Sequence, residues 1–325
     1  MKMLSPAGKT FLLLVILQLY IVAAGKADDL FDLRILPGFA SSTLKIDGVM
    51  VCSSKKDQPN LRRNNFSGLR GDWLASGTVE VSCDGIKKTV DVKDGEFSVS
   101  FTDLNVASLT ISVARDQITL YQENFSVCEK PEIIVISDVD DTILVSDVRN
   151  RIKLVYNSLF KRYDSREPVP GTPQLYQQLL STRPTHFIYL SSSPAFLSRP
   201  LKIFLKNNLF PPGSLVLKKS VTDAAHESHK TDWLKTVMTL NPQLPIILIG
   251  DSGEKDPEIY SSFVQSLPNP SCVKAIIIHE VTDEPERLQT LEHISGEMKK
   301  SGVLFIYWQS VEELRKTLII EGLLR

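Results

Sequence analysis

The chain has 325 residues, and its 37 Lys and Arg nearly balance its 38 Asp and Glu, which leaves a formal net charge of −1. This length is too great for one small core and suits two domains. The balanced charge excludes a global field that attracts nucleic acid, so we expect no nucleic-acid partner. The 42% hydrophobic content is ordinary for a globular protein.

The N-terminal segment reads as a targeting signal. Lysines precede a mainly apolar run over residues 11–24, in which Gln18 is the one amide, and small residues follow it. This pattern predicts a secretory signal peptide over residues 1–27, cleaved after Gly25 or Ala27. The run of about 14 residues is shorter than the roughly 20 that span a membrane, although an uncleaved anchor is the alternative. We therefore expect a protein that is secreted or resides in the secretory-pathway lumen.

Residues 28–128 are predicted to form an all-β domain. Their apolar and polar residues alternate, and Asp-Gly pairs interrupt them, of which Asp94-Gly95 is the hairpin signal. We expect a small sandwich with a structural or docking role. Asn65 and Asn124 begin glycosylation sequons. The alternating runs cover residues 43–54, 77–85, 87–101 and 108–122.

Residues 129–325 are predicted to form an α/β domain with a doubly wound, mainly parallel sheet. Short, wholly apolar runs alternate with helical patterns, as in a sheet that is covered on both faces. The expected strands lie in residues 132–138, 185–193, 214–220, 244–252, 273–281 and 303–310. The expected helices lie in residues 172–181, 194–208, 230–240, 256–267 and 310–320.

Polar residues gather where these strands end, and ligands of such sheets bind there. Asp138 and Asp140 follow the first strand, Ser191 follows the second, Asp251 follows the fourth, and Lys230 begins a helix. Converging carboxylates suit Mg²⁺, which prefers oxygen ligands. One carboxylate can attack phosphorus and a second can act as the acid and base. A serine and a lysine can hold the phosphoryl oxygens.

Simpler interpretations stay open for several of these residues. The acidic run from Asp138 could be an ordinary turn. Asp256 is a secondary site candidate. It precedes a proline, so its role could instead be limited to capping a helix. Lys230 could be a solvated helix-start residue, with Lys218 or Lys219 as the clamp instead.

The order D-x-D-x-T, Ser, Lys and G-D-x4-D resembles the four motifs of the haloacid dehalogenase phosphohydrolase superfamily. The segments "SDVDDTIL", "PVPG", "FIYLSSSP" and "ILIGDSGEKDPEIY" more closely resemble the catalytic domain of the actin-patch-associated Mg²⁺-dependent phosphatidate phosphatases. The resemblance runs from about residue 131 to 283 and implies a haloacid dehalogenase-like fold.

The resemblance implies a role for each matching residue. Asp138 would be the nucleophile and a metal ligand, and Asp140 the general acid and base with a metal-binding carbonyl. Asp251 would bind the metal. Thr142, Ser191 and Lys230 would form the substrate phosphate site, with Thr142 bracing the loop. The sequence departs from the family pattern at Ala195 and at the pair His279-Glu280. The resemblance therefore leaves the identity of the substrate open.

The four cysteines, Cys52, Cys83, Cys128 and Cys272, suit two disulfides in an oxidising compartment. If the fourth strand lies between the first and fifth, as the resemblance implies, Cys128 and Cys272 precede strands about 10 Å apart. We therefore expect Cys128–Cys272 and Cys52–Cys83, with free buried thiols as the alternative.

Residues 148–166 combine an apolar stripe at helical spacing with basic neighbours. Such a helix beside the catalytic loop could contact an anionic membrane, although an ordinary helix packed on the sheet is the alternative. We thus expect a secreted Mg²⁺-dependent phosphomonoesterase that acts through an aspartyl-phosphate, on phosphatidate or a related lipid phosphate. The alternatives are a phosphatase of a soluble ester or phosphoprotein, and a non-catalytic binding protein.

Overall fold

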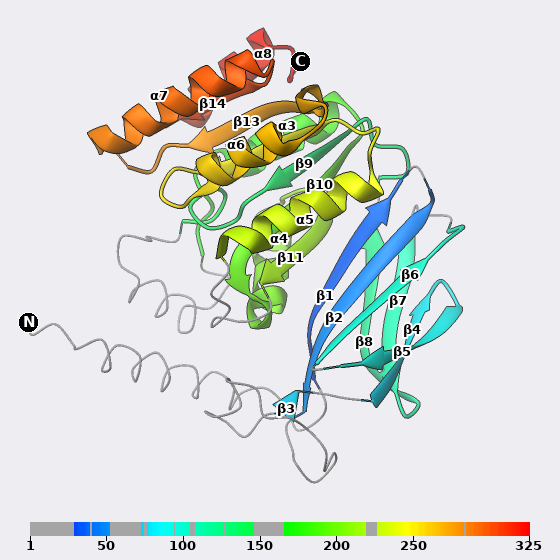
Figure 1. Ribbon diagram of the computed structural model, residues 1–325. Helices are drawn as coiled ribbons and strands as arrows, with labels where there is room; N and C mark the ends of the chain where they lie inside the picture. The colour runs from blue at the N-terminus through cyan, green and yellow to red at the C-terminus, as the bar shows by residue number, and fades with distance from the viewer. Residues whose placement is uncertain are drawn as a thin grey trace, which may run out of the picture.

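The computed structural model describes residues 29–39, 41–52, 73–74, 77–93, 95–104, 108–126, 128–145, 166–218, 226–282 and 284–325. Two antiparallel sheets come first in the chain, and a parallel sheet with helices follows (Figure 1). The signal-peptide segment, Asn65 and residues 148–165 of the expected membrane-contacting segment lie outside the described residues. Within the described ranges, no helix has both the length and the apolar character that crossing a membrane requires.

The two antiparallel sheets enclose a core of their own. One contains β1 (Asp29–Gly38), β2 (Thr43–Cys52), β3 (Trp73–Leu74) and β6 (Glu96–Phe101), with β6 paired to β2. The other has the order β5 (Ile86–Val92), β4 (Gly77–Cys83), β7 (Ser108–Arg115) and β8 (Ile118–Ser126). Alternate side chains of both sheets point inwards and form one buried cluster, which includes Ile46, Val81, Phe97 and Ile111. This is the packing that the alternating sequence pattern predicts.

The predicted tight turn is present, because Lys93 and Glu96 form an antiparallel bridge with two reciprocal backbone hydrogen bonds of 2.9 Å. Beyond this bridge, β5 and β6 pair in different sheets. A second tight hairpin lies at Asp84 and Gly85, which have φ of 46° and 83° and join β4 to β5. Paired positive φ values suit a hairpin because their twist matches that of the strands.

The second half contains a six-stranded sheet in which every pair is parallel. Its order is β11 (Gly213–Lys218), β10 (Thr185–Pro194), β9 (Ile133–Ser137), β12 (Ile246–Asp251), β13 (Val273–His279) and β14 (Leu304–Trp308). Every residue of β9 and β12 is buried. The unbroken apolar runs therefore mark central strands that are covered on both faces.

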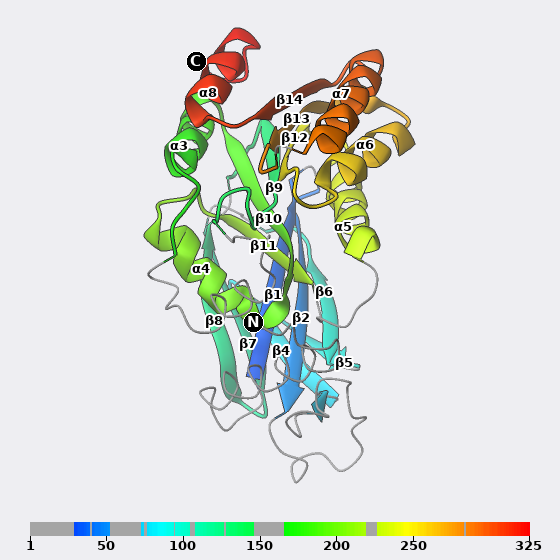
Figure 2. The same ribbon diagram turned by 90° about the vertical axis from the view of Figure 1, so that its left-hand side faces the viewer.

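Helices cover both faces of this sheet (Figure 2). One face packs against α3 (Thr172–Thr182), α4 (Ser198–Asn207) and α8 (Val311–Ile320), and the short η2 (Ala195–Leu197) leads into α4. The other face packs against α5 (His226–Leu240), α6 (Asp256–Ser266) and α7 (Pro285–Lys300), and η3 (Pro270–Cys272) precedes β13. Helix α7 was not predicted, because a narrow stripe of Leu291, Ile294 and Met298 is all that it buries.

The expected disulfides are not formed, because Cys83, Cys128 and Cys272 are free thiols. Cys83 lies fully buried in the core between the antiparallel sheets, as the alternative of buried free thiols anticipates. The strand order that motivated Cys128–Cys272 is present, since β12 separates β9 from β13.

Candidate active site

Three buried carboxylates meet at the carboxyl edge of the parallel sheet. Asp138 follows β9 directly, and its N–H donates to the Ile249 carbonyl at 2.8 Å, which extends the pairing of β9 with β12. Asp251 ends β12, and Asp256 begins α6. One carboxylate oxygen from each residue lies within 4.8 Å of those of the other two, and none of the three is more than 1% exposed. The topology thus brings two predicted residues and the secondary candidate together.

Asp256 does not act as a helix cap. The N-cap of α6 is Lys255, and no side chain makes a capping hydrogen bond there. The Asp256 carboxylate instead packs over Gly250, where a Cβ atom would lie 2.4 Å from Asp256 Oδ2. A residue with a side chain at position 250 would therefore push Asp256 out of the cluster. The capping alternative is wrong for this residue.

Lys230 provides the positive charge of the cluster. Its ammonium donates to Asp138 Oδ1 at 2.8 Å and to Asp256 Oδ1, and it lies 3.7 Å from Glu254 Oε2. The side chain is 1% exposed, so Lys230 is not a solvated helix-start residue. Lys230 forms ion pairs with Asp138 and Asp256, whereas Lys219, one of the alternative clamps, lies outside the described residues.

The electrostatics of the cluster follow from burial. Burial raises the pKa of Asp138 well above its usual range, and the Lys230 ammonium opposes the shift while Asp256 adds to it. Burial and the neighbouring Asp256 also raise the pKa of Asp251 well above its usual range. Burial alone would lower the pKa of Lys230, but the carboxylates of Asp138 and Asp256 hold it well above its ordinary value. The cluster therefore lacks positive charge when its carboxylates are ionised.

The carboxylates that Lys230 leaves unpaired suit a hard cation. Asp251 Oδ1 accepts the N–H groups of Gly253 at 2.6 Å and Glu254 at 3.0 Å, whereas the buried Oδ2 atom has no hydrogen-bond partner. A buried carboxylate oxygen without a partner carries a large desolvation cost. An oxygen-liganded divalent cation would satisfy it, so the donor set fits such an ion.

Asp140 lies apart from the buried cluster and contacts the last residues of β10. Its Oδ2 atom accepts the hydroxyl of Ser193 at 2.7 Å and that of Ser191 at 3.3 Å. Ser191 Oγ in turn accepts the Ser193 N–H at 2.9 Å. Ser191 and Asp140 were predicted to belong to one site, and the fold does bring them together. Ser193 was not among the predicted site residues, although its place in the serine run at the end of a predicted strand was an available signal.

The loop from Asp138 to Leu144 is held in one conformation by local contacts. Thr142 is buried, and its hydroxyl donates to Asp138 Oδ2 at 3.2 Å, so it contacts the expected nucleophile. Asp141 has a φ of 54°, in the left-handed region. His279 Nδ1, at the end of β13, lies 2.6 Å from the Asp141 carbonyl and must carry a proton there, because a carbonyl only accepts. His279, one of the residues at which this sequence differs from the family pattern, thus supports the loop from Asp138 to Leu144.

Arg287 of α7 secures the loop after β12, although no sequence pattern pointed to it. Its Nε donates to the Ser252 carbonyl at 2.7 Å, and its Nη2 donates to the Glu254 carbonyl at 2.7 Å. The same guanidinium forms a two-point pair with Glu258. Asp251 is bound to this loop through Gly253 and Glu254, so Arg287 orients Asp251 indirectly.

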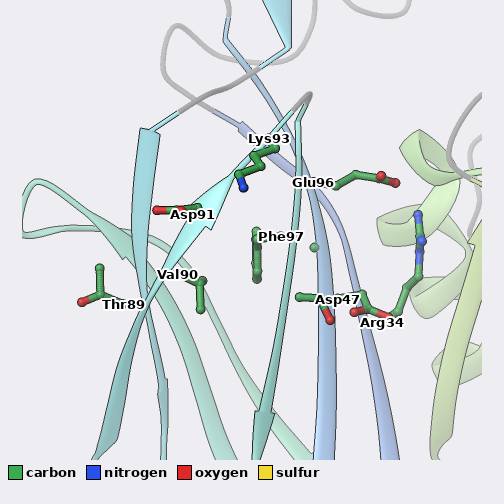
Figure 3. A pocket seen from close by; sticks show the side chains of 10 residues that line it. Arg34, Asp47, Thr89, Val90, Asp91, Lys93, Glu96 and Phe97 are labelled. Carbon is green, nitrogen blue, oxygen red and sulfur yellow. The ribbon is translucent and has the colours of Figure 1, made fainter.

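A separate hollow of about 760 Å³ lies in the antiparallel half of the molecule (Figure 3). None of the strand-end carboxylates or serines described above lines it. It is a polar surface of the sandwich and is distinct from the carboxylate cluster. Its lining consists of Arg34, Asp47, Gly48, Thr89, Val90, Asp91, Lys93, Glu96, Phe97 and Ser98.

Known proteins are similar to the α/β part of the chain. Residues 133–280 match the family model "Phosphatidate phosphatase APP1, catalytic domain". The phosphatidate phosphatase APP1 of Saccharomyces cerevisiae is 30% identical over 141 residues, which cover 42% of this chain and 24% of that protein. An uncharacterised protein of Schizosaccharomyces pombe is 26% identical over 185 residues, covering 54% of this chain and 29% of that one. The chain thus spans about a quarter of the length of these relatives.

The strand-end carboxylates lie within residues 133–280, the part of the chain that is similar to the phosphatidate phosphatase APP1 catalytic domain. Among solved structures, an FMN-binding beta-glucuronidase from Facaelibacterium prausnitzii L2-6 aligns at 10% identity with a TM-score of 0.26, over 85% of this chain and 47% of that one. That score is too low to inform the fold.

Proposed function

We propose that this protein hydrolyses a phosphate monoester, with phosphatidate or a related lipid phosphate as substrate, through an aspartyl-phosphate on Asp138. The observation that carries the proposal is the meeting of Asp138, Asp251, Asp256 and Lys230 at one edge of the parallel sheet. The match to the APP1 catalytic domain supports the lipid substrate. We further propose that the domain is haloacid dehalogenase-like and that the protein is secreted.

We propose Mg²⁺ as the cofactor, held by the carboxylates of Asp138 and Asp251, with Asp256 beside them and the Asp140 carbonyl contributing as the resemblance implies. The unpartnered Asp251 Oδ2 supports this assignment. When bound, Mg²⁺ would neutralise charge on the phosphoryl oxygens and the carboxylates. The chain's own residues would carry out the bond-forming and proton-transfer steps.

The proposed reaction has two steps. A carboxylate oxygen of Asp138 attacks phosphorus, the bond from phosphorus to the ester oxygen breaks, and Asp140 gives its proton to the leaving alcohol. Water then attacks the phosphorus of the acyl phosphate, and Asp140 accepts the proton of that water. Inorganic phosphate leaves, and Asp138 is regenerated. Lys230 and the Ser191 hydroxyl would hold the phosphoryl oxygens during both steps.

The substrate class is tested by assaying phosphatidate in anionic vesicles against a water-soluble phosphate monoester. We expect a much higher kcat/KM on the vesicles. The triple variant Arg149→Glu, Arg151→Glu and Lys153→Glu tests the membrane-contacting segment, and it should lose activity on vesicles but not on the soluble ester. Preference for the soluble ester would favour the soluble-substrate alternative. Absence of turnover on either would favour a binding protein.

Arg287→Met is expected to weaken Mg²⁺ binding about tenfold, because residues that orient metal ligands typically contribute 10–100-fold to affinity. The variant removes both hydrogen bonds to the loop that holds Asp251. Titration calorimetry with Mg²⁺ alone measures the effect without reference to activity.

The matched control is Arg183→Met, because Arg183 also donates to a backbone carbonyl, that of Gly322 at 2.9 Å, but does not contact the carboxylate cluster. This control should bind Mg²⁺ like the unmodified protein. Unchanged Mg²⁺ affinity in Arg287→Met would show that Arg287 does not orient Asp251.

A further inference from the structure

Strand β1 belongs to two cores at once. Leu33 and Ile35 point into the cluster between the antiparallel sheets, whereas Leu36 packs into the cluster of α5, α6 and α7 on the parallel sheet. Asp32 and Arg34, on the same face as Leu36, are only 2% and 7% exposed and form a buried ion pair. In the ribbon view β1 runs beside β11, the edge strand of the parallel sheet, and the two are in contact (Figure 1).

The antiparallel half contacts helix α5 and the residue that follows it at two places. In the middle of the helix, the Arg34 guanidinium lies 5.7 Å and the Lys45 ammonium 5.3 Å from the Trp233 ring centroid. Immediately after the helix, Asn241 Oδ1 accepts the Phe39 N–H at 2.9 Å, and Asn241 Nδ2 donates to the Pro37 carbonyl at 3.0 Å. These contacts fix the helix both along and around its axis.

Helix α5 is also the element that carries Lys230. Trp233 follows Lys230 by three residues, which is less than one helical turn and about 4.5 Å along the axis. The Lys230 ammonium is buried between Asp138 and Asp256, with no room to follow a shift of its helix without losing a partner. A helix moves as a rigid rod over one turn, so the position of Trp233 sets the position of Lys230.

A second contact reaches α4, the helix that follows Ser191 and Ser193 in the chain. Strand β1 contacts both α4 and the short η2 that leads into it. On the same helix, Lys202 donates to Tyr121 and Glu123 of β8 at 2.9 and 2.6 Å. The antiparallel half therefore contacts α5, which carries Lys230, and α4, which follows Ser191 in the chain.

We propose that β1 is a positioning element of the phosphatase site and that Trp233 and Asn241 are the positioning residues through which it holds Lys230. The antiparallel half is then part of the active-site framework and not a separable docking module. The proposal rests on the proposed function, in that Lys230 is taken to bind the substrate phosphate. Figure 3 shows that Arg34 and Asp47, which face each other across β1 and β2, also line the hollow of the sandwich.

The test uses the full-length protein and the variant Trp233→Leu, which removes the ring but leaves no hydrogen-bonding group unpaired. We expect KM for a soluble phosphate ester and the Kd for inorganic phosphate to rise about three- to tenfold, as the loss of two cation–π contacts allows. The value of kcat should fall less. Trp233→Phe should restore most of the affinity. If Trp233→Leu does not fold, Asn241→Ala is the second variant. It should also raise the Kd for inorganic phosphate.

The matched control is Lys88→Met, because Lys88 makes a cation–π contact with Phe101 wholly inside the antiparallel half. It should leave phosphate affinity unchanged. Folded Trp233→Leu or Asn241→Ala protein with unaltered KM and phosphate Kd would overturn the proposal and leave β1 a purely stabilising strand.

A readout independent of catalysis separates this inference from the proposed function. Selective ¹³C labelling of lysine reports the environment of the Lys230 ε-carbon, with the resonance assigned through Lys230→Arg. If the unmodified protein neither binds phosphate nor hydrolyses an ester, the proposed function fails. A displaced Lys230 resonance in Trp233→Leu, with Lys88→Met unaffected, would still support positioning by β1, and an unmoved resonance would refute it.

Discussion

Asp138→Asn is expected to abolish hydrolysis in a protein that stays folded. The amide is nearly isosteric with the carboxylate but cannot form an acyl phosphate, so no other residue replaces it. The loss should exceed the roughly 10²–10⁴-fold that removal of a general acid or base costs, which is the loss expected for Asp140→Asn. Initial rates on a phosphate ester at saturating Mg²⁺ measure both variants.

The fold should tolerate this change because the substitution removes one negative charge from a buried cluster. Lys230 keeps its ion pair with Asp256, and burial no longer opposes ionisation at position 138. The melting temperature without Mg²⁺ should therefore be equal or higher. Asp91→Asn, an exposed position in β5, is the matched control and should leave turnover unchanged. Activity of Asp138→Asn within about tenfold of the unmodified protein would remove Asp138 from the role of nucleophile.

Mg²⁺ is expected to stabilise the folded protein, and by more at pH 8 than at pH 5. Burial raises the pKa values of Asp138 and Asp251 above their unfolded values. The stability from these protonated groups is present below the unfolded pKa and is lost as the pH rises through the raised folded pKa. The metal-free protein is therefore less stable at neutral pH than at acidic pH. Mg²⁺ binds the ionised carboxylates most strongly at neutral pH and above.

Thermal unfolding with and without Mg²⁺, at several pH values, measures this linkage. At about 100 times its Kd, Mg²⁺ should contribute about 2.7 kcal/mol and raise the melting temperature by about 5 °C or more at pH 8. Chelation should also silence hydrolysis, and added Mg²⁺ should restore it. Asp251→Asn should abolish the Mg²⁺ increment, while Asp91→Asn should keep it. A Mg²⁺ increment that is absent at pH 8, or larger at pH 5, would argue against a metal site in the cluster.

The strands of the parallel sheet could be predicted because their sequence pattern is strong and local. A short, wholly apolar run such as β9 is stable only where both faces are covered, so the pattern alone indicates a central strand. The convergence of Asp138, Asp140, Ser191 and Asp251 follows from one geometric rule, namely that parallel strands end at the same edge. The family resemblance added roles that no spacing reveals, and these roles stay predictions.

Several features depend on contacts between residues far apart in the sequence, so no local pattern indicates them. Arg287 lies on a polar helix, and its importance comes from meeting the loop of Ser252 and Glu254 in space. The strands that flank Gly95 look like a hairpin in the sequence but pair in different sheets. The cysteine prediction failed because strand order alone does not bring the sulfur atoms of Cys128 and Cys272 together.

The sequence by itself determined the six strands of the parallel sheet and the residues at the strand ends, because periodicity and strand termination are properties of neighbouring residues. Only the tertiary structure decided that β1 joins the two halves, since its buried Asp32 and Arg34 read as ordinary polar residues of an alternating strand. Their burial is a property of the helices packed against them. The position of α5, and with it Lys230, is therefore set by packing between distant segments.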